Sequence, residues 1–290
     1  MSLAVTGATG HLGSLVVGAL LDRGVEAEQI IALVRNPDAA ASLSDRGVHV
    51  RRADYDDPAT ITEALEGVER LVFVSGSEVG RRVDQHRAVI EAASTHGLAQ
   101  VAYTSIPRAD TTPLLLAAEH RATEELIRTA GVPYTFLRNS WYIENYTGRL
   151  ASYLEAGEIV GAAGSGRVSA AARQDYAAAA AAVVTGDGHL DQTYELGGDV
   201  AFTMADLAQV VSDETGRQIP YRDIPVDEHT RGLVAAGLPQ PAAAVFADTD
   251  AGVARGDLLV QSGDLARLIG RPTVTLREAI RSAVAELPKN

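Results

Sequence analysis

The sequence predicts an α/β protein: a Rossmann-type, doubly wound parallel sheet followed by a smaller, mainly helical C-terminal lobe. Short apolar runs alternate with helix-like stretches six times between residues 1 and 138. A glycine-rich turn follows the first apolar run, and the alternation stops after residue 138. We therefore expect a dinucleotide-binding domain over 1–138 and a substrate-binding lobe over 139–290, with chain crossings between them allowed.

The first unit is a strand over 2–6, a turn over 7–13 and a helix that begins inside the turn. Glycines at every third position of the turn let the main chain approach a pyrophosphate closely. The N-terminus of the following helix favours negative charge. A structural glycine turn is the alternative. The dinucleotide interpretation predicts cofactor contacts from Gly7, Ala8, Thr9, Gly10, His11 and Leu12.

The second strand, 29–34, ends at Arg35, which lies 22 residues after Gly13. At this position a dinucleotide fold places the residue that reads the adenosine ribose. An acid would bind the 2′-hydroxyl of NAD, whereas an arginine suits the 2′-phosphate of NADP through a charge-assisted, forked contact. Arg35 therefore predicts NADPH, with a surface arginine at a strand end as the alternative.

The third and fourth strands, 48–52 and 70–74, are followed by further cofactor candidates. Asp54 lies just past a strand end, where it could accept a hydrogen bond from the adenine amino group. The small residues after the fourth strand would let the cofactor pass over the sheet: Ser75, Gly76 and Ser77. Ser77 could instead cap the helix 81–95, and Asp56 and Asp57 are expected to cap the helix 59–65.

The fifth strand, 100–103, leads to Thr104 and Ser105, and a helix over 113–130 precedes the sixth strand, 132–138. The carboxyl ends of parallel strands share one edge, so Thr104 and Ser105 are also expected near the cofactor. His86, inside the helix 81–95, is interpreted as an ordinary packed or solvated histidine. No second ligand stands at a metal spacing from it, so we expect no metal site.

The second part begins with a polar and aromatic run over 139–146 that contains the only tryptophan. Its later segments predict strands over 158–160, 192–196 and 217–221, and helices over 175–184, 204–215, most of 226–249, 265–269 and 276–287. We expect Asp175 to cap the first of these helices.

Composition excludes several classes of protein. The chain has 290 residues, no cysteine and a formal net charge of −13. Disulfides and thiol chemistry are therefore excluded, and nucleic acid is disfavoured as a partner. No signal peptide is recognised, and no apolar stretch reaches the ~18 residues of a membrane helix. We expect a cytoplasmic protein with no membrane partner.

The whole chain resembles the NmrA-like, atypical short-chain dehydrogenases, in particular the bacterial NAD(P)H:quinone oxidoreductase type related to triphenylmethane reductase. The resemblance is carried by residues 5–13, 34–37, 53–55, 75–80, 103–105 and 137–146, and extends to 161–164 and 175–177. The run Arg138-Asn139-Ser140-Trp141-Tyr142-Ile143-Glu144-Asn145 is the most specific part. The resemblance implies NADPH as hydride donor and a planar, quinone-like small molecule as acceptor. We expect a monomer or a homodimer, and the sequence does not decide between the two.

The chain departs from ordinary short-chain dehydrogenases, which use a Tyr-x-x-x-Lys pair as proton donor. Its only lysine, Lys289, lies beside the C-terminus with no tyrosine four residues before it. Related reductases often carry a lysine in the helix after the fifth strand, where this chain has His120. The catalytic candidates, as hydrogen-bond donors near the developing oxyanion, are Asn139, Tyr142 and His120. Arg173 is a further candidate donor. Additional cofactor contacts are expected from Asn139, Trp141, Tyr142, Glu144 and Arg173.

Four alternatives stay open. His120 could be a helix-surface histidine, and Trp141 a residue that packs the two lobes together. The protein could be a non-enzymatic redox sensor that binds NADP(H) without turnover, as some NmrA-like proteins are. It could also reduce another electrophile, such as a triphenylmethane dye or a nitrogen-containing ring.

Overall fold

The computed structural model describes residues 1–78 and 80–287. Its main sheet has seven strands in the order β3-β2-β1-β4-β5-β6-β8, and every neighbouring pair is parallel. The strands are β1 (Leu3–Thr6), β2 (Ile30–Val34), β3 (His49–Arg52), β4 (Arg70–Phe73), β5 (Gln100–Ser105), β6 (Tyr134–Asn139) and β8 (Gln192–Leu196). The order reverses at β1, so the predicted doubly wound sheet is confirmed.

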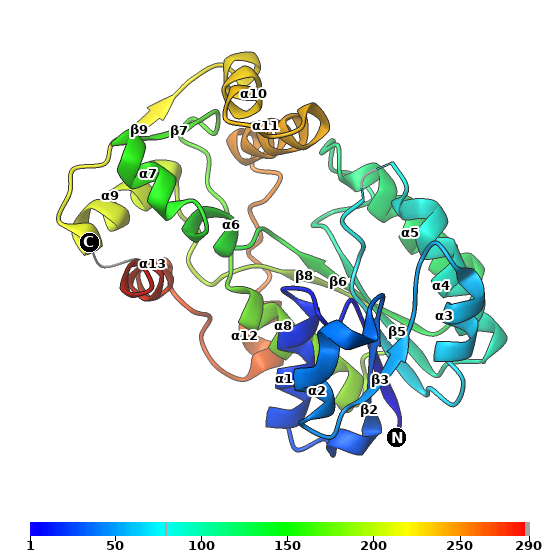
Figure 1. The fold of residues 1–290 in the computed structure, drawn as a ribbon. Coiled ribbons are helices and arrows are strands. Elements are labelled where there is room, and N and C mark those ends of the chain that lie inside the picture. Colours follow the sequence, from blue (N-terminus) through cyan, green and yellow to red (C-terminus); the bar gives the residue numbers. More distant parts are fainter. Residues whose placement is uncertain (79, 288–290) are drawn as a thin grey trace.

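Helices cover both faces of the sheet (Figure 1). One face packs on α1 (Gly13–Asp22), α8 (Arg173–Thr185) and α12 (Asp264–Ile269). The other packs on α3 (Pro58–Ala64), α4 (Arg82–Thr95) and α5 (Ala117–Thr129). β1 and β2 are buried along their whole length and, apart from Thr6, consist of apolar residues, as expected for parallel strands covered on both faces. The short helix α2 (Ala41–Ser44) precedes β3 and was not predicted.

The chain crosses between its two parts. Both α8 and β8 come from beyond residue 138, yet α8 packs against α1 and β8 pairs with β6 as the seventh strand. The alternating pattern of the N-terminal part therefore continues once more after an excursion into the second lobe.

The second lobe contains α6 (Glu144–Thr147), α7 (Leu150–Ala156), β7 (Ile159–Gly161), α9 (Met204–Thr215), β9 (Tyr221–Asp223), α10 (Val226–Ala235), α11 (Gln240–Arg255) and α13 (Leu276–Ala285). It is mainly helical, as expected, with β7 and β9 as a parallel pair. Its core also takes Ile106, Ala109 and Leu114 from the segment after β5. In Figure 1 this lobe lies beside the sheet, at the upper left.

Several predicted boundaries are wrong, for tertiary reasons. The helix expected from residue 113 begins at Ala117, because Leu114 is packed into the core of the second lobe. The strand expected over 217–221 lies at 221–223, where it pairs with β7.

The structure also differs from the expected helix caps. The N-cap of α8 is Ala172; Asp175 lies in the first turn, buried, and accepts a hydrogen bond from Val274 N. The N-cap of α4 is Arg81, so Ser77 does not cap it. Asp57 occupies the N-cap position of α3, but its side chain makes no capping hydrogen bond.

Candidate active site

The glycine turn after β1 has the geometry of an anion-binding loop. Gly7 has a φ of 58°, and Gly10 N donates to Gly7 O at 2.8 Å. A Cβ on Gly13 would lie 2.2 Å from Gly7 O, so only glycine fits there. In the described structure α1 has no side-chain cap and no acid in its first turn. Ser14 N already donates to Gly10 O at 3.0 Å, but no side chain of the described residues occupies this helix N-terminus, and the residues present fit a pyrophosphate.

A cavity of about 310 Å³ opens beside this turn, at the carboxyl edge of the sheet. It is lined by residues from four of the strand ends, among them Gly7, Thr9, Gly10, Arg35, Asp54, Tyr55, Gly76 and Ser77. The structure thus brings the predicted adenosine-side residues together. Arg35 is exposed at its rim. A larger cavity of about 650 Å³ lies between α13 and the start of α8, and Glu144 is among the residues that line it.

Other predicted residues of this edge have definite positions. Thr104 joins the β4 and β5 ends, because its Oγ1 accepts from Ser75 N at 2.9 Å. Asp54 Oδ1 accepts from Asp56 N, and the other carboxylate oxygen lies 3.6 Å from Arg52. In the turn, His11 is exposed, whereas the Ala8 and Leu12 side chains point into the core and offer only their main chain.

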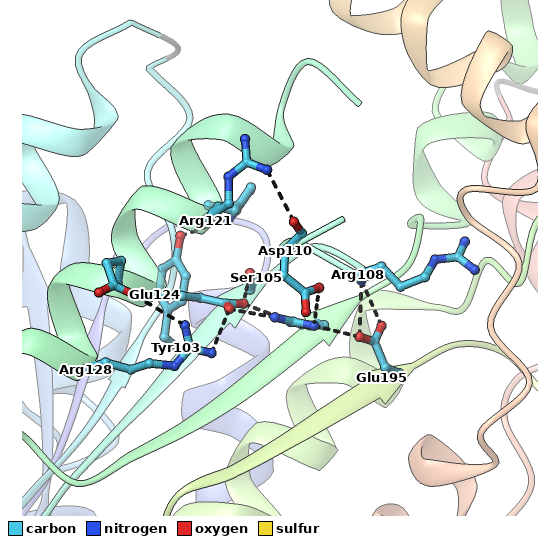
Figure 2. A network of polar contacts seen from close by, with 11 residues as sticks. Tyr103, Ser105, Arg108, Asp110, Arg121, Glu124, Arg128 and Glu195 are labelled. Atoms are coloured by element: carbon cyan, nitrogen blue, oxygen red, sulfur yellow. Dashed lines mark hydrogen bonds and ion pairs between the residues drawn. The ribbon is translucent and has the colours of Figure 1, made fainter. Parts of the chain in front are cut away.

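Ser105 belongs to a buried ionic network at the ends of β5, β6 and β8 (Figure 2). Its hydroxyl donates to Glu124 Oε1 at 2.7 Å. Glu124 also accepts from Arg138 Nε at 3.0 Å and from Arg138 Nη2 at 2.8 Å. The other Arg138 nitrogen donates to Glu195 at 3.0 Å and to Asp110 at 3.1 Å. Ser105 is therefore engaged within the protein.

The charges of this network are held by one another. Burial alone would lower the pKa of Arg138, but its hydrogen bonds to Glu124 and Glu195 raise that pKa above its ordinary value. Burial raises the pKa of Glu195, against the opposing effect of Arg138. Sequence reasoning missed this network, although a charged residue in a buried strand, Arg138, signals a buried partner.

The network also fixes the segment that joins β5 to the second lobe. Arg108, with a φ of 48°, donates from its backbone N to both Glu195 oxygens at 3.1 Å. Its Nη2 donates to Gly256 O at 2.7 Å. Leu115 N donates to Asp248 of α11 at 2.8 Å. The sheet edge and the second lobe are therefore tied together beside the predicted site.

Three predicted donors form one cluster after β6. Asn139 Nδ2 lies 3.5 Å from Tyr142 Oη, and the Arg173 guanidinium lies 4.9 Å above the Tyr142 ring. Burial raises the pKa of Tyr142, while Asn139 and Arg173 act to lower it. Asn139 Oδ1 is buried and has no hydrogen-bond partner among the described residues. This orphaned acceptor fits a site that is completed by a polar ligand.

Glu144 and Trp141 support this cluster from the second lobe. Glu144 Oε1 accepts from Arg173 N at 2.8 Å, and Asn145 Oδ1 accepts from Arg173 Nη2 at 2.8 Å. The Trp141 ring packs edge-on against Phe246 of α11, with ring centroids 6.3 Å apart. The Trp141 side chain therefore packs against α11 of the second lobe.

His120 is not a helix-surface residue; that alternative is wrong. It is buried, and its Nδ1 lies 2.8 Å from Tyr103 Oη. Burial, and then the charge of Arg82, holds its pKa well below the ordinary value, so the ring is neutral. No hydrogen bond in the described residues joins His120 to Asn139, Tyr142 or Arg173. The described structure thus shows no direct hydrogen bond that would place it in their cluster.

The described residues contain no group of three or more His, Asp or Glu side chains that could hold a metal ion. Over the same residues, no helix is both long and apolar enough to cross a membrane.

A doubly wound sheet with an open glycine turn, an arginine after β2 and a donor cluster after β6 defines a dinucleotide-binding oxidoreductase of the Rossmann type. The chain belongs to the NmrA-like family, whose model matches residues 1–251.

The chain is similar to several reductases over nearly its full length. It is 46% identical to quinone oxidoreductase 2 of Escherichia coli over 96% of this chain and 97% of that protein. The NADPH complex of that enzyme has a TM-score of 0.95 and covers 97% of this chain and 99% of that one. Citrobacter triphenylmethane reductase with NADP(H) is 40% identical, with a TM-score of 0.92, over 97% and 100% of the two chains. An NAD(P)H azoreductase of Xenophilus azovorans is 30% identical over 98% of each chain.

Proposed function

We propose that this protein is an NADPH-dependent reductase that transfers hydride to a quinone or a similar planar aromatic acceptor. The observation that carries the proposal is the shared sheet edge. There the open glycine turn, the exposed Arg35 and the Asn139–Tyr142 donor pair all follow parallel strands. The names of the similar enzymes, which reduce quinones, triphenylmethane dyes or azo compounds with nicotinamide cofactors, support it.

Three groups of residues would bind three regions of NADPH. The main chain of the turn 7–13 and the start of α1 would bind the pyrophosphate. Arg35 would bind the 2′-phosphate through a charge-assisted contact, and Asp54 with Ser75, Gly76 and Ser77 would line the adenosine side. Thr104 and Asn139 would mark the nicotinamide side, with Trp141 and Glu144 behind it. When bound, NADPH supplies the hydride.

The protein's own contribution is orientation and hydrogen bonding. Because burial raises the pKa of Tyr142, its hydroxyl keeps its proton and can donate to an acceptor oxygen. Asn139 Nδ2 and the Arg173 guanidinium offer further donors to a developing oxyanion. A quinone spreads negative charge over its ring, so donors without a dedicated acid suffice. This assignment replaces the Tyr-x-x-x-Lys pair; Lys289 lies outside the described residues.

Single-turnover NADPH oxidation with a simple benzoquinone tests the proposal. We expect Asn139→Ala and Tyr142→Phe each to slow the step by roughly 10- to 1000-fold, the scale of an oxyanion-stabilising hydrogen bond. NADPH affinity should change less. Tyr134→Phe is the matched control, because Tyr134 lies at the opposite end of β6 from Asn139. It should react like the wild type.

Two outcomes would point elsewhere. NADPH binding without oxidation by any quinone would favour the redox sensor, the second candidate. Loss of all activity in His120→Ala, together with its pH profile, would show a true general acid that our account lacks. The mass of the protein in solution decides between a monomer and a homodimer.

A further inference from the structure

The peptide groups of Gly76, in the wall of the cofactor cavity, are held by two buried side chains of α4. Gly76 N donates to His86 Nε2 at 3.0 Å, and Arg82 Nε donates to Gly76 O at 2.7 Å. His86 is 0% exposed and Arg82 is 5% exposed. Gly76 itself lines the cavity. Both polar groups of this residue are therefore directed by side chains that lie beneath the site.

The two hydrogen bonds of the His86 ring are compatible with only one tautomer of the neutral ring. Because Nε2 accepts from Gly76, the ring proton resides on Nδ1, which donates to Thr123 Oγ1 at 2.9 Å. The Thr123 hydroxyl in turn donates to Glu119 O at 2.8 Å. Burial, and then the charge of Arg82, lowers the pKa of His86 to about 3, so the ring stays neutral. Thr123 therefore fixes the tautomer that allows His86 to accept from Gly76.

The other half of the arrangement is an ion pair between α4 and α5. Arg82 Nη1 donates to Glu119 Oε2 at 3.0 Å, and the Glu119 side chain is 15% exposed. Glu119 Oε1 accepts from Gly80 N at 2.7 Å. Glu119 thus holds Arg82 in place and also binds the main chain at the far end of the loop. Each buried group in this cluster has a partner, as a stable buried network requires.

We propose that His86 and Arg82 are positioning residues for the cofactor, and that Thr123 fixes the tautomer of His86. Together they fix the orientation of the Gly76 peptide and so shape the adenosine side of the cavity. None of the three is a catalytic residue. This inference rests on the proposed binding of NADPH at the edge of the sheet.

The test is the affinity for 2′,5′-ADP, a probe with the adenosine 2′-phosphate but no nicotinamide, measured by calorimetry on the full chain. Thr123→Val keeps the shape but cannot accept from His86 Nδ1. It should raise the Kd for 2′,5′-ADP by about 3- to 10-fold, the loss of about one hydrogen bond. Thr123→Ser keeps the hydroxyl and should bind like the wild type. His86→Leu should weaken binding likewise, and His86→Gln should restore much of it, because a Gln side chain can still accept from Gly76.

Separate measurements of KM and kcat distinguish a loss of cofactor positioning from a general loss of folded protein. In Thr123→Val the KM for NADPH should rise while kcat at saturating NADPH stays within about twofold of the wild type, because remote positioning affects uniform binding. Val89→Ala is the control: Val89 is buried in the same helix, 1% exposed, and packs in the core. It should lose stability without losing affinity.

Wild-type affinity in both Thr123→Val and His86→Leu would overturn the inference, as would an equal loss in Val89→Ala. If His86→Leu fails to fold, the Thr123→Val and Thr123→Ser pair still decides. A wild-type protein that does not bind 2′,5′-ADP would instead refute the proposed cofactor site.

Discussion

Glu124 should be among the most costly single side chains to remove from this protein. Its carboxylate, 2% exposed, accepts two hydrogen bonds from Arg138 and one from Ser105, at 2.7–3.0 Å. In Glu124→Ala the guanidinium would stay buried, with Glu195 and Asp110 as its remaining acidic partners, 28% and 64% exposed. Breaking a buried ion pair by removing one partner costs about 3–5 kcal/mol. We expect that loss in the free energy of unfolding.

Equilibrium unfolding in urea, followed by circular dichroism, measures this loss as a shift of the midpoint at constant slope. Glu125→Ala is the matched control, because the Glu125 side chain is 71% exposed and lies 4.0 Å from Arg128. An exposed pair of this kind contributes at most about 1 kcal/mol.

Replacing both partners, as Glu124→Leu with Arg138→Met, should recover much of the loss, because the Arg138 guanidinium then no longer stays buried without the Glu124 carboxylate. The reasoning fails if Glu124→Ala is no less stable than Glu125→Ala. It also fails if the double variant is less stable than the sum of its single changes predicts.

Three further predictions concern the cofactor and pH. Arg35→Ala should weaken NADPH binding by about 1–3 kcal/mol and barely change NADH binding; equal loss for both cofactors in steady-state titrations would refute the phosphate role. Gly10→Val should abolish NADPH binding while circular dichroism stays near the wild type, because a side chain there would stand where the main chain is expected to approach the pyrophosphate; normal binding would place the cofactor elsewhere. Burial lowers the pKa of His86 to about 3, so its stabilising effect is complete above about 6.5 and declines as pH falls toward 3. Urea unfolding should therefore show stability falling from pH 7 to pH 5, by at most about 1.4 kcal/mol per pH unit for this group, and His86→Gln should fall less; parallel curves would contradict the assignment.

The sequence was informative wherever the signal is local. Apolar runs and glycine positions are local features of the chain, and they predicted the six parallel strand–helix units and the glycine turn. The spacing after the second strand likewise predicted that Arg35 lies on the adenosine side of the site. The comparisons confirm the family, and the NADPH complex of a similar enzyme supports the expected cofactor. The roles given to individual site residues stay predictions.

The sequence was less informative wherever a side chain is committed by a distant partner. Ser105 was expected at the cofactor, but Glu124, 19 residues away on α5, takes its hydroxyl. His86 was interpreted as an ordinary packed or solvated residue, because nothing near it in the chain shows that Thr123 and Gly76 flank its ring. Asp175 was expected to cap α8, but it pairs with Arg271, which comes almost a hundred residues later.

These distant partnerships converge on α5. Its buried residues include His120, Thr123 and Glu124 beside the apolar Ile127, so it is a covering helix with a polar inner face. On the adenosine side, Glu119 accepts from Gly80 N, and Thr123 holds His86, which accepts from Gly76 N. On the other side, Glu124 holds Arg138 directly before Asn139. Polar groups in such a position are costly unless fully paired, and an apolar face would cover the sheet at lower cost. We therefore explain the polar face of α5 by the two segments that it holds at this edge of the sheet. One presents the Gly76 main chain in a fixed direction, and the other presents the Asn139 amide.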